Sequence, residues 1–433
     1  MILSGVILLV VFFALVALNV PIAVSIGLAS LSALLLTMPF DPAVTTMAQR
    51  VASGLDSFTL LAIPFFVVAG YLMGRGGIAR RLIGAAKGLV GAVPGGLALV
   101  NIISCMLFGS ISGSAVAATS AIGTFMVPVM EDEGYDREYA AAVTVSGSIL
   151  GLLIPPSNVL IVYAVAAGSV SIAALFLAGY LPGILAGLAL MIAAAGYAKK
   201  MNYPITGRMP VQESAKAVIG ALPSILMVVV VVGGIIAGVF TATEASAIAV
   251  LYALVLSVGL YREIPLGELP ELLLKAIETS AMVLFLIGVS TGMAWVLAYG
   301  NIPQAVSEAM LTITDNPFLL LLLINVLLLV VGAFLDITPA ILIFTPIFLP
   351  IAVQLGMSPT HFGIMMTLNL SIGLCTPPVG SALFVGTAVA GTTIQKMIRP
   401  LMVLYVALIA ALLLVTYVPF ISEALPRAFG LID

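Results

Sequence analysis

Long apolar stretches recur along the whole chain and are separated by short polar segments. A bilayer core of roughly 30 Å is crossed by a helix of about 20 apolar residues. Ten stretches fit this description and are predicted to cross a membrane: 3–18, 22–38, 57–74, 139–165, 172–197, 222–240, 244–261, 275–298, 361–391 and 400–418. The pattern therefore predicts an all-α polytopic membrane protein embedded in a lipid bilayer.

Two further apolar stretches, 92–130 and 317–353, are too long for one helix. Each is interrupted halfway, the first by a Gly/Ser/Thr-rich segment and the second by Asp-Ile-Thr-Pro at 336–339. We expect both to be re-entrant hairpins, each entering and leaving the membrane on one side. The segments 139–165 and 361–391 each contain a Pro-Pro pair and are expected to be broken helices.

The basic residues predict the orientation. If the N-terminus lies in the periplasm, every Lys and Arg except Arg50 and Arg427 falls on the cytoplasmic side. For a chain placed in a bacterial inner membrane, the excess of positive charge in cytoplasmic loops therefore predicts that both termini are periplasmic. In this orientation the first hairpin opens from the cytoplasm and the second from the periplasm.

Composition narrows the function classes. The chain is 62% hydrophobic and 8% charged, with a mean hydropathy of +1.29, whereas soluble domains are about a quarter charged. No basic stripe suits nucleic acid. The two cysteines, Cys105 and Cys375, lie in apolar segments, and His361 is the single histidine. This argues against a disulfide framework and against multi-histidine metal sites.

The chain contains an internal repeat. A shift of 222 residues pairs Pro128 with Pro350 (350 − 128 = 222) and the Pro-Pro pair at 155–156 with the one at 377–378. We predict a first repeat at 1–198, a cytoplasmic linker at 199–221 and a second repeat at 222–433. Five crossings and one hairpin per half would place the second half inverted in the membrane. Secondary transporters with such repeats bind their substrates near the bilayer midplane.

The first half offers candidate chemistry at its hairpin tip and its break. Residues 109–114 (GSISGS) supply hydroxyls and carbonyls that suit an alkali cation, although a small-residue packing face is the alternative. The Pro-Pro break leaves carbonyls that favour a cation, and it leaves free amides at residues 157–158 that favour an anion. The alternative at the Pro-Pro break is a simple helix kink with no binding role.

In the second half, Thr376 adds a hydroxyl before the prolines. Asp336 is the most isolated charge in the chain, and a carboxylate inside a membrane is a functional candidate by default. The alternative is local, with Thr338 as N-cap, Pro339 at the first helical position and Asp336 bonding within the same turn. Both interpretations stay open at this stage.

Four other segments have expected roles outside the site. Glu244 is expected to cap a helix, and His361 to lie in a solvated helix start in an outer loop. Residues 75–83 and their counterpart 301–312 are expected to form two amphipathic arms along opposite membrane faces, which would suit an elevator motion.

Four short stretches of the sequence resemble the motifs of a known transporter family. They are 60–66 (LLAIPFF), 109–117 (GSISGSAVA), 154–158 (IPPSN) and 373–380 (GLCTPPVG). With these, the chain resembles the large membrane subunit of tripartite ATP-independent periplasmic (TRAP) transporters over essentially its whole length. The resemblance implies sodium-driven import of an organic acid such as a C4-dicarboxylate or sialic acid, with Na⁺ as coupling ion and no organic cofactor. It also implies two partners, a small four-helix membrane subunit and a periplasmic substrate-binding protein. The implied fold has elevator-type scaffold and transport domains, similar to divalent-anion/sodium symporters.

The family's pattern also implies site residues. One sodium would be held by Ser112, Ser114, Gly151, Ile154 and Pro156, largely through backbone carbonyls. The repeat-related sodium falls on Asp336, Thr338, Gly373, Thr376 and Pro378. The substrate carboxylate would lie near Ser110, Asn158, Gly380 and Ser381.

Three other functions compete with a tripartite transporter as explanations of the sequence. A stand-alone sodium/carboxylate symporter of the same fold would need neither partner. An intramembrane enzyme would need a paired catalytic set, but Asp336 is the one clear carboxylate at mid-membrane. A channel would need a charged ring or a repeated pore motif. We expect a transporter and not an enzyme, with the small subunit on a separate polypeptide.

Overall fold

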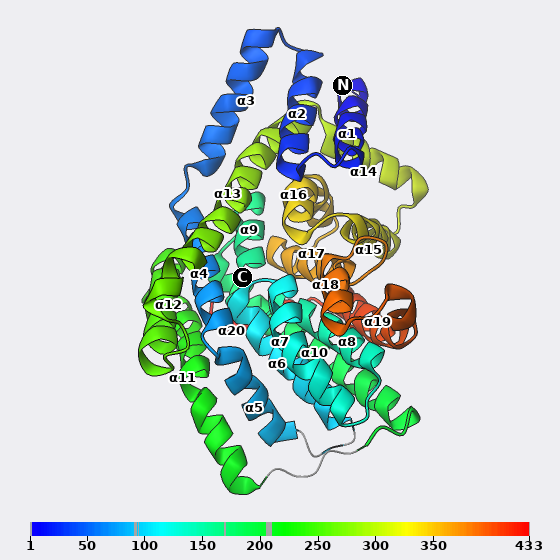
Figure 1. The fold of residues 1–433 in the computed structure, drawn as a ribbon. Coiled ribbons are helices and arrows are strands. Elements are labelled where there is room, and N and C mark those ends of the chain that lie inside the picture. The colour runs from blue at the N-terminus through cyan, green and yellow to red at the C-terminus, as the bar shows by residue number, and fades with distance from the viewer. Residues whose placement is uncertain (1, 91–92, 94, 169, 205–209, 433) are drawn as a thin grey trace.

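The computed structural model describes residues 2–90, 93, 95–168, 170–204 and 210–432 (Figure 1). Part of the predicted linker, 205–209, and residues 92 and 94 at the start of the first predicted hairpin lie outside the described residues. The first half contains α1 (Ile2–Ala17), α2 (Ile22–Leu35), α3 (Phe40–Leu55), η1 (Phe58–Leu61), α4 (Ala62–Arg75), α5 (Ile78–Val90), α6 (Gly96–Ser112), α7 (Ala115–Asp132), α8 (Arg137–Ser148), η2 (Ile149–Leu152), α9 (Asn158–Ala167) and α10 (Ile172–Lys200).

The second half contains α11 (Val211–Ile236), α12 (Ala242–Leu254), η3 (Val255–Leu260), η4 (Leu266–Glu268), α13 (Leu269–Tyr299), α14 (Ile302–Ile313), α15 (Pro317–Phe334), α16 (Ile337–Gln354), α17 (Pro359–Gly373), α18 (Ser381–Ala390), α19 (Ile394–Tyr417) and α20 (Phe420–Ala428). Eight helical segments in the described chain are long and apolar enough to cross a membrane: Phe58–Arg75, Ile172–Lys200, Gln212–Ile236, Ala242–Leu260, Leu266–Tyr299, Pro317–Phe334, Ile337–Gln354 and Ile394–Tyr417. The chain is thus an all-helical, multi-pass membrane protein.

Several helix bounds differ from the expected spans. The helix α11 begins at Val211, so the end of the predicted linker is helical. The helix α3, which carries Asp41 and Arg50, lies between two expected spans and was not predicted, because its mixed polar pattern falls below the hydropathy of a crossing. The interrupted stretch 317–353 consists of the two helices α15 and α16.

The helix bounds follow the 222-residue shift. Shifted by 222, α7 (Ala115–Asp132) covers the same residues as α16 (Ile337–Gln354). The pairs α6 and α15, α8 and α17, and α9 and α18 agree at their starts within a residue. Each half therefore presents the same order of elements, with two helices that meet at a tip followed by a helix that breaks and restarts.

We divide the helices into two bodies, which also contact each other where α4 packs on α6 and α13 packs on α16. In the first body α4 packs on α12 and α13, α11 packs on α12, and α13 also contacts α2 and α3. In the second body α6, α7 and α19 pack on α8, α15 and α19 pack on α17, and α18 packs on α7. Figure 1 shows α4, α11 and α12 as a column on the left and α6, α7, α8 and α10 to its right. The helices α5 and α14 contact both bodies. The predicted arm 301–312 agrees with α14 within a residue, whereas the predicted arm 75–83 begins at the end of α4 and covers only the first part of α5.

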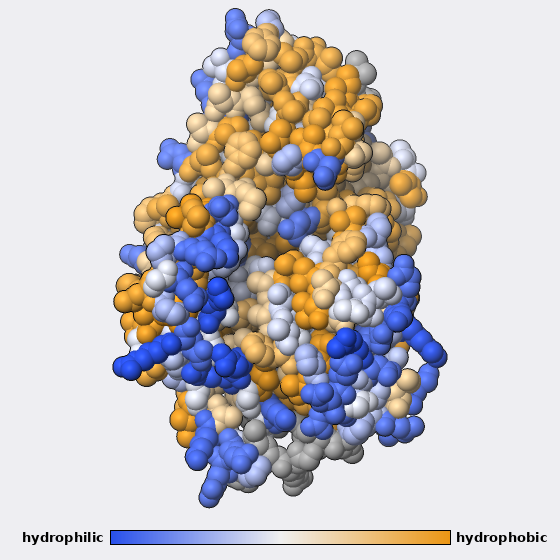
Figure 2. Space-filling view, viewed as in Figure 1, coloured by the Kyte–Doolittle hydropathy of each residue, from blue (hydrophilic) through white to orange (hydrophobic). Residues whose placement is uncertain are grey.

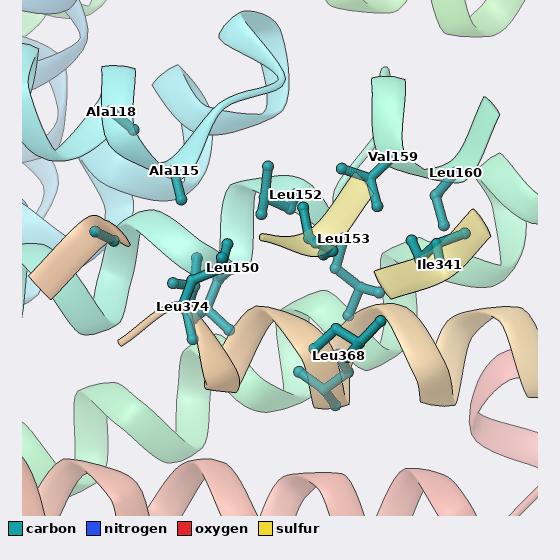
Figure 3. Close-up of a cluster of buried hydrophobic side chains, with 14 of the residues drawn as sticks. Ala115, Ala118, Leu150, Leu152, Leu153, Val159, Leu160, Ile341, Leu368 and Leu374 are labelled. Carbon is teal, nitrogen blue, oxygen red and sulfur yellow. The ribbon is translucent and has the colours of Figure 1, made fainter. Parts of the chain in front are cut away.

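An apolar core joins the two breaks within the second body (Figure 3). Leu150, Leu152 and Leu153 of the first break are buried beside Ile341 of α16 and Leu374 of the second break. Inside a bilayer, such side chains stabilise the packing through van der Waals contact and not by leaving water. This packing fixes the two breaks against each other and so positions the polar groups around them.

The structure decides two local expectations, one at Glu244 and one at His361. The expected cap at Glu244 is confirmed, because Thr241 and Glu244 form a reciprocal capping box at the start of α12. The expectation of a solvated His361 is wrong. It does lie in the first turn of α17, but only 1% of it is exposed, and its Nε2 lies 2.8 Å from the carbonyl oxygen of Val415. The first turn of α17 is buried because α19 and α20 pack over it.

Candidate functional site

The first hairpin tip is a two-residue turn between α6 and α7. Gly113 ends α6 with φ +63°, a left-handed conformation that glycine adopts without a Cβ penalty. Ser114 is the N-cap of α7, and its hydroxyl accepts a hydrogen bond from the amide of Ala117 at 3.2 Å. A Cβ on Gly113 would lie 2.7 Å from Nδ2 of Asn158, so the start of α9 contacts the tip directly.

The second hairpin tip places a carboxylate where the first has a hydroxyl. Asp336 is the N-cap of α16 and accepts a hydrogen bond from the amide of Ile337 at 3.0 Å. The prediction that Thr338 is the N-cap is wrong, because α16 begins at Ile337 and Thr338 is already helical. Asp336 therefore performs the local capping role, and its side chain also faces the cavity described below.

The two breaks differ in how their helices restart. Ser157 caps α9, accepting from the amide of Leu160 at 3.4 Å and donating to the carbonyl oxygen of Leu152. The helix α18 starts at Ser381 after Gly380, which lacks a side chain to cap it. Thr376 donates to the carbonyl oxygen of Ile372 at 2.8 Å. Both Pro-Pro peptide bonds are cis.

Glycines bring each break against its own hairpin. A Cβ on Gly151 would lie 2.4 Å from Cα of Gly109, and a Cβ on Gly373 would lie 2.4 Å from the carbonyl carbon of Gly332. Real Cβ atoms do not approach backbone atoms this closely. The two glycines therefore allow the broken helix and the hairpin to touch backbone to backbone, which places the polar groups of tip and break within one region.

A cavity of about 540 Å³ lies between the two bodies. The face shown in Figure 2 is hollowed in this region. Of the predicted site residues, the cavity is lined by Ser112, Ser114, Asn158, Asp336, Thr338 and Ser381. The other predicted residues do not line it: Ser110, Gly151, Ile154, Pro156, Gly373, Thr376, Pro378 and Gly380. The cavity thus brings together both hairpin tips and the restart of both broken helices.

Two polar atoms at this site lack a partner within the described structure. They are Oδ1 of Asn158 and Oγ of Ser381, both buried. A buried polar atom without a hydrogen bond costs about 1–3 kcal/mol. Both residues line the cavity. Oδ1 of Asn158 can only accept a hydrogen bond, whereas Oγ of Ser381 can donate or accept one.

The donor set is composed of oxygen ligands. Carboxylate, hydroxyl and carbonyl oxygens suit hard cations, and Asp336, Thr338 and Ser114 supply the first two kinds. Among the predicted carbonyl ligands, that of Gly373 already accepts the amide of Thr376 at 2.9 Å and retains one lone pair. In the described part of the chain, no cluster of three His, Cys, Asp or Glu residues could hold a metal ion.

Sequence reasoning missed the wall that the first body contributes. Tyr71 and Arg75 of α4 and Thr279 of α13 line the cavity, and the hydroxyls of Tyr71 and Thr279 lie 3.0 Å apart. The available signal was the spacing on α4, where Val67, Gly70, Tyr71, Gly74 and Arg75 share one helical face.

The comparisons with known proteins agree with this architecture. The family model "Tripartite ATP-independent periplasmic transporter, DctM component" matches residues 9–421. The YgiK protein of Salmonella typhimurium is 50% identical over 419 residues, covering 97% of this chain and 96% of YgiK. The isethionate TRAP transporter permease protein DctMQ of Oleidesulfovibrio alaskensis is 40% identical over 423 residues, covering 97% of this chain and 65% of that protein.

Two further similarities address function class and fold. The C4-dicarboxylate TRAP transporter large permease protein DctM of Rhodobacter capsulatus is 37% identical over 439 residues, covering 98% of this chain and 99% of DctM. The crystal structure of the Alcanivorax borkumensis YdaH transporter covers 86% of this chain and 87% of its own, with a TM-score of 0.63 and 12% identity, and supports the fold alone. The chain therefore belongs to the large permease subunits of TRAP transporters, and it is a transporter permease and not an enzyme.

Proposed function

We propose that this permease imports a small organic acid across the bacterial inner membrane, driven by a sodium gradient. The observation that carries the proposal is the cavity, where Asp336 and hydroxyls from both hairpin tips face the free Asn158 and Ser381 side chains. Oxygen acceptors such as Oδ1 of Asn158 suit sodium, whereas the free hydroxyl of Ser381 can donate a hydrogen bond to a carboxylate. Relatives named for C4-dicarboxylate, isethionate and sialic acid transport make an organic acid the natural cargo.

Two sodium ions would be held by repeat-related residues. The first set centres on Ser112 and Ser114, and the second on Asp336 and Thr338, with carbonyls from the adjoining breaks completing each. Bound sodium would supply positive charge beside Asp336, and the cargo carboxylate could then occupy the space between the two tips. This arrangement explains how one site serves a cation and an anion together.

The two halves would lie inverted in the membrane, with both termini in the periplasm, in the manner of secondary transporters built from inverted repeats. One body would move against the other as an elevator, with α5 and α14 as the arms between them. A periplasmic binding protein would deliver the acid, and a small four-helix subunit on a separate polypeptide would complete the permease.

The test is sodium-gradient uptake in proteoliposomes, with the permease supplied with and without its binding protein. The panel consists of succinate, isethionate and sialic acid. Uptake of one acid that needs both sodium and the binding protein supports the proposal. Sodium-driven uptake without any binding protein would favour a stand-alone symporter, and an equal rate in potassium would remove the sodium coupling.

A further inference from the structure

Among the described residues that line the cavity, two carry a charge, Arg75 and Asp336. They belong to different bodies. Asp336 lies at the second hairpin tip, and Arg75 is the last residue of α4. A cargo anion is repelled by a carboxylate, so the cationic partner in the cavity wall has to be sought on α4.

Arg75 lies further along the cavity than the polar groups of the tips. The hairpin tip meets α4 at Gly70, where an added Cβ would lie 3.0 Å from the carbonyl oxygen of Ser112. Five residues along a helix correspond to about 7.5 Å of rise. The cavity continues over this distance, past Tyr71 and Gly74. Arg75 therefore occupies the end of the cavity that the charge pattern assigns to the cytoplasm.

The guanidinium of Arg75 is weakly held. Its closest acidic partner is Glu268 at 3.7 Å, and the two side chains are 63% and 49% exposed. Such an exposed, long ion pair adds little to stability. By contrast, Arg80 bonds Glu263 at 2.9 Å, while Arg81 bonds the carbonyl oxygen of Gly77 at 2.9 Å and stacks on Tyr261. Of these three neighbouring arginines, Arg75 is the one that can exchange its partner at low cost.

We infer that Arg75 receives the carboxylate or sulfonate of the cargo at the cytoplasmic end of the cavity, and that Glu268 competes for the same guanidinium. The planar fork of arginine matches a two-oxygen anion with two parallel hydrogen bonds. Binding there would draw the acid away from the tips, and the return of Glu268 would release it. This inference rests on the proposed function, and it makes Arg75 a determinant for anionic cargo over neutral analogues.

The test uses the complete transporter in proteoliposomes and the panel acid that the wild type transports, whether succinate, isethionate or sialic acid. The half-saturation concentration for internal acid is measured in exchange, beside the sodium activation midpoint. Arg75→Gln is expected to raise that concentration about tenfold, the change that follows from losing one charge-assisted hydrogen-bond pair. Arg75→Lys should recover part of the loss, because it keeps the charge without the fork.

Two further variants complete the design. Arg80→Gln is the matched control, since it removes a neighbouring arginine that does not line the cavity, and it should stay within about twofold of wild type. Glu268→Gln removes the competitor and should lower the half-saturation concentration. The sodium midpoint, measured with saturating acid, should not move in any of these variants.

Equal values for Arg75→Gln and Arg80→Gln would overturn the role of Arg75 while leaving the proposed function standing. A sodium midpoint that shifts together with the anion constant in Arg75→Gln would overturn it as well, since the residue would then act through general damage to the site. A wild type that neither takes up nor exchanges any of the acids would remove the proposed function, and the inference with it.

Discussion

The two halves of the chain share their geometry but differ in their polar chemistry. Shifted by 222 residues, the hairpin helices α7 and α16 coincide, and each broken helix touches its hairpin through a glycine. At the first tip, however, the N-cap is the hydroxyl of Ser114, and at the second it is the carboxylate of Asp336. The comparison teaches that the backbone frame and the ligand set can vary independently.

The points where the two broken helices restart also share their geometry and differ in their polar groups. In the first half Ser157 satisfies the helix start with its own hydroxyl, and Asn158 is left with a free Oδ1. In the second half Gly380 caps nothing, and Ser381 is left with a free hydroxyl. Each half thus offers one unpartnered polar atom to the cavity, from a different chemical group.

The largest effect, a loss of stability, is expected at the glycine contacts that the two halves share. Gly151→Ala and Gly373→Ala each place a Cβ 2.4 Å from backbone of the facing hairpin, which cannot yield as a side chain can. Overpacking of this kind costs about 1–3 kcal/mol or more. Both variants should lower the melting temperature of the purified protein by similar amounts and reduce its yield.

The matched control is Gly196→Ala in α10, where an added Cβ has nothing within 4 Å. Alanine favours a helix by about 1 kcal/mol over glycine, so this variant should melt no lower than wild type. If only one of Gly151→Ala and Gly373→Ala lowered the melting temperature, the backbone contact between hairpin and broken helix would not be equivalent in the two halves.

The next largest effect, on sodium activation, is expected at Asp336, where the two halves differ in charge. Asp336→Asn keeps a side chain that caps a helix as well as aspartate does, so the melting temperature should change little. It removes the negative charge that would pair with sodium, and the sodium activation midpoint in proteoliposome uptake should rise about tenfold or more. Asp315→Asn, an exposed carboxylate outside the cavity wall, is the control.

Neutral ligands should give smaller shifts. Ser114→Ala and Thr376→Val are expected to weaken sodium dependence a few-fold each, since each loses a hydroxyl and no charge. Unchanged sodium activation in both variants would remove the sodium assignment from these residues.

A third contrast separates capping from ligand binding. Ser157→Ala removes a buried cap and should destabilise the protein by about 1 kcal/mol, with the half-saturation concentration for the acid retained. Ser381→Ala removes a hydroxyl without a partner in the described structure, so stability should hold while the half-saturation concentration rises a few-fold. Melting curves and uptake kinetics on the same preparations check both, and a reversed pattern would exchange the two roles.

Local signals predicted much of this architecture, because glycine and proline act on their own backbone. The Pro-Pro breaks and the interruptions at 109–114 and 336–339 all mark observed helix ends. Tertiary packing could not be predicted in the same way. His361 is buried by helices from far along the chain, and Arg75 lines the cavity because α4 crosses a hairpin tip. The prediction of Thr338 as N-cap was wrong for a local reason. Asp336 and Thr338 can both cap a helix and lie two positions apart, and in the structure Asp336 is the N-cap.

The smallest effect concerns the arms. The helix α5 is joined to the first body by ion pairs from Arg80 and Arg81 to Glu263, whereas in α14 the buried contacts are apolar, at Pro303 and Met310. Because these ion pairs are partly exposed, Glu263→Gln should cost below about 1 kcal/mol, and less at high salt. Melting at 50 mM and 1 M NaCl checks this, because salt screens the pairs of α5 over a Debye length of about 3 Å at 1 M and leaves apolar contacts intact. A loss that persists at 1 M NaCl would mean that Glu263 holds the arm through buried hydrogen bonds, and the two arms would then differ less than their charges indicate.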